Sequence, residues 1–332
     1  MSGTSVPYHL RQNKYVERHV FVDLLGYLDR WQPLDEYLYV GFGAIYFEDF
    51  KLLHSHFAMK RMLSIEKEEW VLPRQKLNVP YGCVDHEHCD SSEFIQNLDT
   101  YRRKYRAKNL LVWLDYAGGL EIAAQLNDVK ALVPNLLAND ILKVTFEAEP
   151  NELASRTDGA DKEVFDARLE KLRSLLGTQF LPDGISPKQM TEEEYPAVLC
   201  EAFKRVVAGA MRESPGLIFQ PIGSYVYKDT SQMITITGIL LDRTETEGFW
   251  KTTEIKDFDL AGLSWELQRI EVPDLSLREK FLLDQVIFNR TAEQVEKKIG
   301  ITFARDRDQS LKMIENYMKF YRYYPNFYPV VV

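Results

Sequence analysis

Short apolar runs alternate with longer amphipathic stretches between residues 15 and 150. Residues 36–43, EYLYVGFG, have the composition of a buried strand, and residues 44–58 place apolar side chains at helical spacing. Further strands are predicted at 61–68, 81–89, 109–118 and 141–150, with helices at 91–106, opened by a serine cap, and 119–137. Because parallel neighbours need crossover helices, this order predicts an α/β fold with a mostly parallel sheet covered on both faces.

The second half of the chain has a different pattern. Residues 151–190 are charged, are predicted to be an insertion and carry an amphipathic helix at about 161–176. After a helix at 191–212, two β-rich runs joined near Lys228 predict an antiparallel pair at the edge of the sheet. The last part is helical and ends in an aromatic tail. The predicted organisation is an N-terminal helical segment, an α/β domain and a C-terminal helical extension, at 1–34, 35–245 and 246–332.

Composition narrows the class of protein. With 332 residues and 45% apolar content the chain can bury a large core, and its three cysteines are too few for a disulfide framework, which favours a reducing compartment. No apolar run approaches the roughly 20 residues that span a bilayer, and the start lacks a secretory signal, so we expect a soluble, cytoplasmic protein without a membrane partner. A net charge of -9 argues against broad adhesion to nucleic acid.

Glycines and carboxylates follow the predicted strands at corresponding positions. Gly41 and Gly43 lie where the first strand turns into the first helix, and residues without a Cβ allow close approach of a ligand there. Glu66, Asp90 and Asp115 lie at or just beyond the ends of the next three strands. Because the carboxyl ends of parallel strands meet at one edge of a sheet, these residues are predicted to border one crevice.

At this point the sequence resembles the class I S-adenosylmethionine-dependent methyltransferases, over about 35–150 and again over 216–242. The resemblance implies a Rossmann-like sheet with an antiparallel pair, S-adenosylmethionine as cofactor, and a divergent, O-methyltransferase-like activity. It implies cofactor binding by Gly41, Phe42, Gly43, Glu66 at the ribose, and Asp90 with Ser91 near the adenine. It also implies that Asp115 and Tyr116 border the transferred methyl group.

Two functions remain open. The first is methyl transfer to an unidentified small-molecule or macromolecular acceptor, through an oxygen nucleophile that Asp115 orients or deprotonates. The second is a catalytically inactive subunit that binds a protein or nucleotide within a larger complex. The stretch LDYAGG, residues 114–119, lacks the two prolines of amino-directed nucleic-acid methyltransferases, and this argues against methylation of a nucleic-acid base.

Charged residues near the N-terminus add a further possibility. Arg11 and Lys14 precede the predicted core and could pair with the methionine carboxylate or an acidic substrate, although a solvated helix start has the same composition. Glu48, in the first turns of the first helix, could reach the crevice.

Three other stretches have competing interpretations. Residues 83–89, CVDHEHC, carry metal-binding side chains, but strand alternation divides them between two faces, so no metal is expected. Residues 101–108, YRRKYRAK, could bind a phosphate backbone, yet a solvated helix face is favoured and nucleic acid is not the favoured partner. The tail aromatics, from Tyr317 to Tyr328, are expected to fold back on the core or to contact a protein partner, as the insertion could also do.

Overall fold

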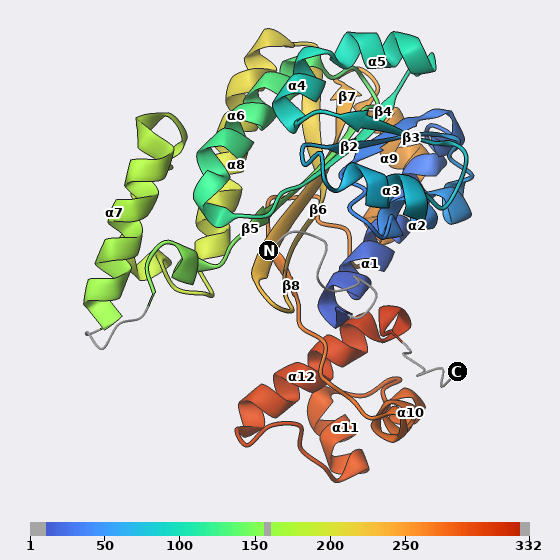
Figure 1. The fold of residues 1–332 in the computed structure, drawn as a ribbon. Helices are drawn as coiled ribbons and strands as arrows, with labels where there is room; N and C mark the ends of the chain where they lie inside the picture. The colour runs from blue at the N-terminus through green and yellow to red at the C-terminus, as the bar shows by residue number, and fades with distance from the viewer. Residues whose placement is uncertain (1–10, 156–160, 326–332) are drawn as a thin grey trace.

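A computed structural model describes residues 11–155 and 161–325. At its centre is an eight-stranded sheet of order β3-β2-β1-β4-β5-β7-β6-β8 (Figure 1). The strands are β1 (Leu38–Gly41), β2 (Arg61–Glu66), β3 (Val84–His88), β4 (Leu110–Asp115), β5 (Ile141–Glu147), β6 (Leu217–Lys228), β7 (Gln232–Asp242) and β8 (Gln268–Ile270). The first five strands are parallel and β7 is antiparallel to both of its neighbours. The predicted Rossmann-like sheet is confirmed.

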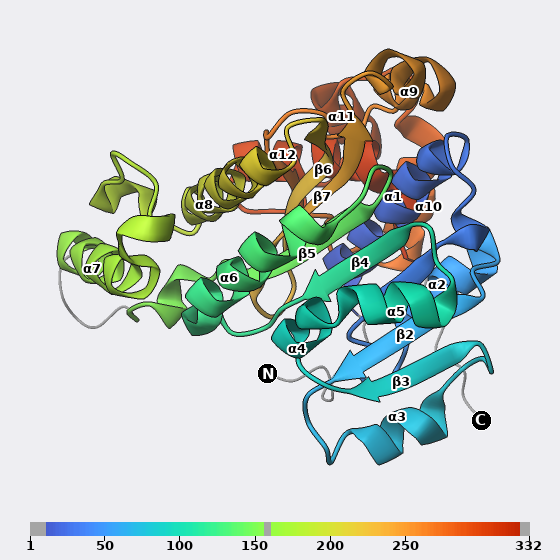
Figure 2. The ribbon, with the colours of Figure 1, turned by 90° about the horizontal axis from the view of Figure 1, so that it is seen from above.

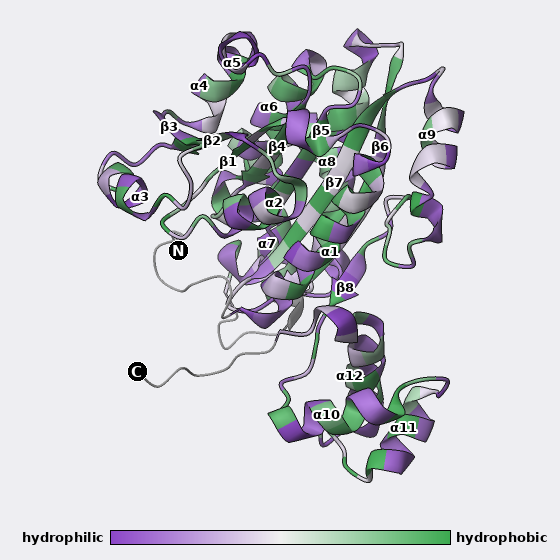
Figure 3. Ribbon diagram, turned by 90° about the vertical axis from the view of Figure 1, so that its right-hand side faces the viewer, coloured by the Kyte–Doolittle hydropathy of each residue, from purple (hydrophilic) through white to green (hydrophobic). Residues whose placement is uncertain are grey.

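Helices cover both faces of the sheet (Figure 2). One face carries α4 (Ser91–Gln96), α5 (Leu98–Tyr105), α6 (Ile122–Leu132), α7 (Asp161–Phe180) and α8 (Tyr195–Ala210). The other carries α1 (Gln12–Asp29), α2 (Glu48–Phe57) and α9 (Thr246–Thr253), and α3 (Leu72–Asn78) precedes β3. Helices α10 (Leu277–Val286), α11 (Ala292–Ile299) and α12 (Arg307–Phe320) gather below β8 (Figure 3).

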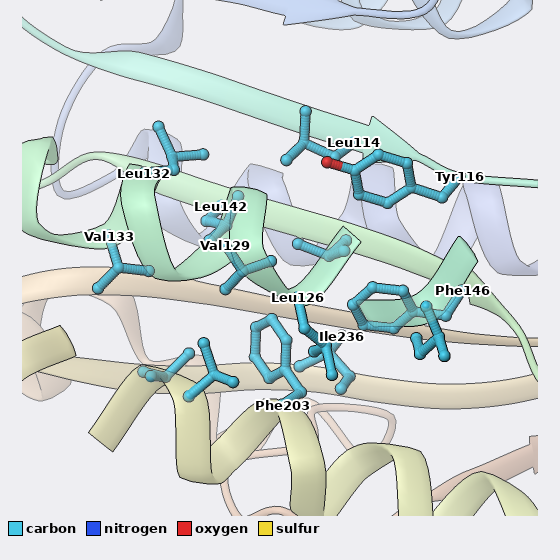
Figure 4. Close-up of a cluster of buried hydrophobic side chains, with 14 of the residues drawn as sticks. Leu114, Tyr116, Leu126, Val129, Leu132, Val133, Leu142, Phe146, Phe203 and Ile236 are labelled. Atoms are coloured by element: carbon cyan, nitrogen blue, oxygen red, sulfur yellow. The ribbon is translucent and has the colours of Figure 1, made fainter. Parts of the chain in front are cut away.

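Apolar packing fixes α6 and α8 against the sheet. Leu126 of α6 and Phe203 of α8 are fully buried, and they meet Phe146 and Ile236 from the strands (Figure 4). Burying a side chain of this size stabilises the fold by about 1.5 to 3 kcal/mol. Helix α6 is therefore held firmly, with its polar residues placed beside the strand ends.

The first two predicted helices begin differently from expectation. The helix predicted from residue 44 begins only at Glu48, because Ala44 and Phe47 have left-handed φ values of 47° and 52°. The helix predicted at 91–106 is capped by the Asp90 side chain, which accepts a hydrogen bond from the Glu93 amide at 2.8 Å, rather than by a serine. It also divides at Asn97 into α4 and α5.

The antiparallel pair is confirmed, but its predicted place at the sheet edge is wrong. Strand β8 pairs with β6 along Tyr225–Tyr227 and lies outside it. The C-terminal segment therefore contains a strand as well as helices. At three residues, β8 is too short to produce an alternating pattern in the sequence.

The basic stretch and the aromatic tail had competing interpretations. Most cations of the basic stretch are exposed, as favoured, whereas Arg102 forms a buried ion pair with Asp140. The tail folds back, as favoured: Tyr317, Phe320, Tyr323 and Tyr324 are buried, while Phe327 and Tyr328 lie outside the described residues. Within the described ranges, no helix has both the length and the apolar character needed to cross a membrane.

The glycine turn supplies a stability test. A Cβ at Gly43 would lie 2.5 Å from Ser64 Oγ and 2.6 Å from the Phe47 ring, so Gly43→Ala should destabilise the fold by about 1 to 3 kcal/mol through overpacking. Nothing lies within 4 Å of the corresponding position at Gly82, so Gly82→Ala should change stability by less than about 0.5 kcal/mol. Urea unfolding of both variants measures this. Equal losses would contradict the crowding at Gly43.

Candidate active site

One cavity of about 560 Å³ opens at the carboxyl ends of the parallel strands. Strand order reverses between β1 and β4, which is where an open α/β sheet binds its ligand. Most of the site residues predicted from the sequence line this cavity: Arg11, Lys14, Phe42, Glu66, Asp90, Ser91, Asp115 and Tyr116. The predicted convergence of strand ends is present in the structure.

The two glycines do not line the cavity. Its wall includes the neighbouring Phe42 and Ala44. A Cβ on Gly41 would meet the Tyr39 ring, and one on Gly43 would meet Ser64 and Phe47. The absence of side chains at both glycines is therefore explained by packing within the protein.

Glu66 faces the cavity from the end of β2. One carboxylate oxygen accepts a hydrogen bond from the Glu68 amide at 2.9 Å, and the other accepts one from Gln75 Nε2 at 3.2 Å. Partial burial raises the pKa of Glu66. Since a carboxylate oxygen can accept two hydrogen bonds, Glu66 is held in place with acceptor capacity to spare.

Asp115 anchors a buried group of charges that sequence order does not reveal. Its Oδ2 lies 3.3 Å from Lys14 Nζ and 3.5 Å from Arg18 Nη2, and Arg18 also pairs with Asp49. Burial acts to raise the pKa of Asp115, but Lys14 and Arg18 outweigh it, and the pKa is lowered. Burial lowers the pKa of Lys14 to about 8, assisted by Arg18 and opposed by Asp115.

Asp128 organises the opposite wall. Its carboxylate accepts hydrogen bonds from the hydroxyls of Ser91, Ser92 and Tyr116, the last at 2.7 Å. Burial and then Asp128 raise the pKa of Tyr116, which keeps its proton. Sequence reasoning did not find Asp128, although a carboxylate on the apolar side of an amphipathic helix was an available signal.

Two polar atoms in the cavity wall lack hydrogen-bond partners among the described residues. They are the hydroxyl of Tyr227, whose side chain is 1% exposed, and Oε1 of Gln125, which is 2% exposed. The Gln125 amide nitrogen already donates to the Gly118 carbonyl at 3.0 Å. A buried unsatisfied polar group costs about 1 to 3 kcal/mol, so these atoms mark places where a ligand would be stabilised.

The cavity wall is predominantly acidic. In the described part of the chain, eight carboxylates and three cationic side chains line it. This balance suits a ligand with positive charge and opposes a polyanion. The ranges 11–155 and 161–325 contain no group of three or more His, Cys, Asp or Glu side chains placed to hold a metal ion.

The sequence matches a family model described as "Putative O-methyltransferase" over residues 6–332, which is almost the whole chain. The chain belongs to this methyltransferase family, and S-adenosylmethionine is its cofactor. The acidic wall and the partnerless polar atoms are compatible with this sulfonium cofactor. A comparison with curated proteins finds no match.

Solved structures give more distant similarities. Trm1 from Pyrococcus horikoshii with S-adenosyl-L-methionine is 14% identical over 91% of this chain and 75% of that chain, with a TM-score of 0.41. An S-adenosylmethionine-dependent methyltransferase from Anabaena variabilis is 11% identical over 70% and 87%, with a TM-score of 0.38. A chain of a fibrillarin/Nop5p complex is 11% identical, covering 62% of this chain and 72% of that chain, with a TM-score of 0.31. TM-scores this low carry no argument about function.

The lowered pKa of Lys14 makes stability depend on pH. The unfolded lysine titrates near 10.4, so between about pH 8 and 10.4 the unfolded chain binds more protons and stability rises with pH. From pH 8 to 9.5 the wild type should gain about 1.5 kcal/mol relative to Lys14→Met. Urea unfolding at both pH values checks this, with exposed Lys130→Met as the control. Identical pH dependence in wild type and Lys14→Met would contradict it.

Removing the Tyr227 hydroxyl should not destabilise the protein. Because that hydroxyl has no partner among the described residues, Tyr227→Phe should leave stability unchanged or raise it by up to about 1 kcal/mol. The matched variant is Tyr225→Phe, which removes a hydroxyl that donates to the Leu260 carbonyl and should cost about 0.5 to 1.5 kcal/mol. Thermal or urea unfolding separates the two. A larger loss for Tyr227→Phe would mean that its hydroxyl has a stabilising partner.

Proposed function

We propose that the protein transfers a methyl group from S-adenosylmethionine to an oxygen atom of a small acceptor that is not a polyanion. The observation that carries this proposal is the Lys14–Asp115 ion pair in the wall of the cavity. The partnerless hydroxyl of Tyr227 lines the same cavity. When bound, the cofactor supplies an electrophilic methyl group on sulfur. The residues of the chain supply binding and orientation.

The cofactor is proposed to lie along the β1–β3 side of the cavity. Glu66 would accept hydrogen bonds from the ribose hydroxyls, since its oxygens retain acceptor capacity. Phe42 would contact the ligand, with Gly41 and Gly43 shaping the turn that carries it. Asp90 and Ser91 would border the adenine, and Arg11 would pair with the methionine carboxylate.

Asp115 and Tyr116 are proposed to shape the reacting end of the site. The cations beside Asp115 keep it ionised at neutral pH, which makes it a weak base and a strong partner for Lys14. Tyr116 is held by Asp128 and stays protonated, so its ring serves as a fixed wall. Catalysis would then come mainly from holding the acceptor in line with the methyl group.

The charge of the cavity limits the acceptor. A phosphate backbone would face eight carboxylates, so a small neutral or cationic molecule with a hydroxyl group fits better than nucleic acid. The alternative of an inactive binding subunit gains no support from the family assignment. Incubation of the protein with methyl-labelled S-adenosylmethionine and either a small-molecule cell extract or total RNA tests this. Label should enter only the small-molecule fraction, and label in RNA would refute the proposed acceptor class.

Glu66 gives the sharpest test of the cofactor position. Glu66→Ala should weaken S-adenosylmethionine and S-adenosylhomocysteine by about 1.5 to 3 kcal/mol in isothermal titration, the scale of hydrogen bonds to a charged group. Glu69 is exposed and outside the cavity wall, so Glu69→Ala should bind like the wild type. A loss below about 0.5 kcal/mol for Glu66→Ala would remove Glu66 from the cofactor site.

A further inference from the structure

We propose that Lys14 accepts the proton of the acceptor hydroxyl and that Asp115 is the positioning residue that holds Lys14 in the cavity wall. This inference rests on the proposed transfer to oxygen. It gives the N-terminal helix a catalytic residue and reassigns Lys14, whose sequence-based role was to bind the cofactor. The carboxylate of the cofactor is left to Arg11.

The backbone of Lys14 is fixed by the turn between β6 and β7. The Asp229 carboxylate accepts hydrogen bonds from the amides of Asn13 at 3.0 Å and Lys14 at 2.9 Å. The Asn13 side chain donates to the Lys228 carbonyl at 2.8 Å. The first turn of α1 is therefore attached to the rim of the cavity, and Lys14 has a defined starting point.

The side chain of Lys14 runs from this anchor to the end of β4. It is 5% exposed, it lines the cavity, and its Nζ donates to Asp115 Oδ2 at 3.3 Å. The titratable and charged groups around it come from several elements. They are Arg11 just before α1, Arg18 on α1, Asp49 on α2, Asp115 on β4, Tyr227 on β6, and Asp229 in the β6–β7 turn.

Tyr227 is an independent sign that a ligand oxygen belongs in this place. Its buried hydroxyl lines the same cavity without a partner among the described residues. Burial, followed by Asp115, raises its pKa, so it stays protonated and can donate a hydrogen bond. An acceptor oxygen bound by Tyr227 would satisfy that donor and would lie on the side of the cavity that carries Asp115 and Lys14.

Lys14 is better suited to accept a proton than Asp115. Asp115 is stabilised as an anion by two cations, whereas burial and Arg18 destabilise the charged form of Lys14. With a pKa of about 8, roughly a tenth of Lys14 is neutral at pH 7. A base with a pKa near the working pH is the effective kind.

The proposed step balances. The acceptor O–H bond breaks and its proton goes to the neutral amine of Lys14, which becomes an ammonium beside Asp115. The oxygen forms its bond to the methyl carbon, and the electron pair of the carbon–sulfur bond stays on sulfur in the thioether product. Lys14 then returns its proton to solvent.

Ligand binding distinguishes a role of Lys14 as proton acceptor from a role in binding the cofactor carboxylate. S-adenosylhomocysteine carries the amino-acid carboxylate, and 5′-methylthioadenosine lacks it. Lys14→Met should leave the affinity of both within about twofold by calorimetry, whereas Arg11→Met should weaken only S-adenosylhomocysteine, by about tenfold or more. Selective loss of S-adenosylhomocysteine in Lys14→Met would assign Lys14 to the carboxylate and overturn the inference. Failure of the wild type to bind either probe would instead count against the proposed function.

Direct titration tests the base itself and does not require activity. Protein labelled with ¹³C at lysine Cε and bound to S-adenosylhomocysteine should show one resonance, absent in Lys14→Arg, with a midpoint near pH 8. Asp115→Asn should move that midpoint lower, because the carboxylate that favours the ammonium form is gone. A midpoint above 10, or no response to Asp115→Asn, would overturn the inference even if Lys14→Met fails to fold.

Turnover gives the final comparison. With the acceptor fraction found by label transfer, the wild-type rate should rise about tenfold per pH unit up to about pH 8. Lys14→Met and Lys14→Arg should both lose about 10²-fold or more in kcat, with little change in KM for S-adenosylmethionine. Full activity in Lys14→Met would remove Lys14 from the chemistry.

Discussion

The structure depends on the buried ion pairs that attach α1 to the middle of the sheet. Lys143 of β5 and Glu17 of α1 are both fully buried and paired, and the Lys143 ammonium lies 4.3 Å from the centre of the Phe21 ring and 4.5 Å from that of Trp113. Burying such charges is unfavourable unless both partners are present, and removing one typically costs 3 to 5 kcal/mol. The pairs therefore specify how α1 lies across β4 and β5.

One side of α1 contacts both the buried core of the sheet and the wall of the cavity. One turn of helix separates Glu17, which pairs with β5, from Lys14, which pairs with the end of β4. Arg18, the residue after Glu17, pairs with both Asp49 and Asp115. Each of these cations has a carboxylate partner. The charged groups can therefore lie in the low-dielectric interior beside the cavity without being left unpaired. The position of the helix and the electrostatics of the site have a common cause.

Much of the fold could be predicted because its signals are local in the sequence. Alternating strands and helices gave the parallel sheet, and strand-end residues such as Glu66 and Asp115 were correctly expected at one crevice. The rest depends on contacts between distant segments. Lys14 and Asp115 are 101 positions apart. Asp128 of α6 can accept a hydrogen bond from Ser91 of α4 only after the two helices have packed side by side. The reason for the glycines could not be read from the sequence, because a glycine that avoids Phe47 and one that admits a ligand look alike there.

The hydrogen bonds that Asp229 accepts from the start of α1 determine when this helix can be fixed in place during synthesis. Helix α1 is synthesised before its partners, because Asp229, which accepts from the Lys14 amide, lies 215 positions after Lys14. Pro273, whose carbonyl accepts from Gln12, lies 261 positions after Gln12. Contacts between such distant segments form slowly, because a long loop must first be closed. Until β6 and β7 have been synthesised, the first turn of α1 lacks these fixing contacts. The proposed catalytic lysine is thus translated well before the segments that hold it in place.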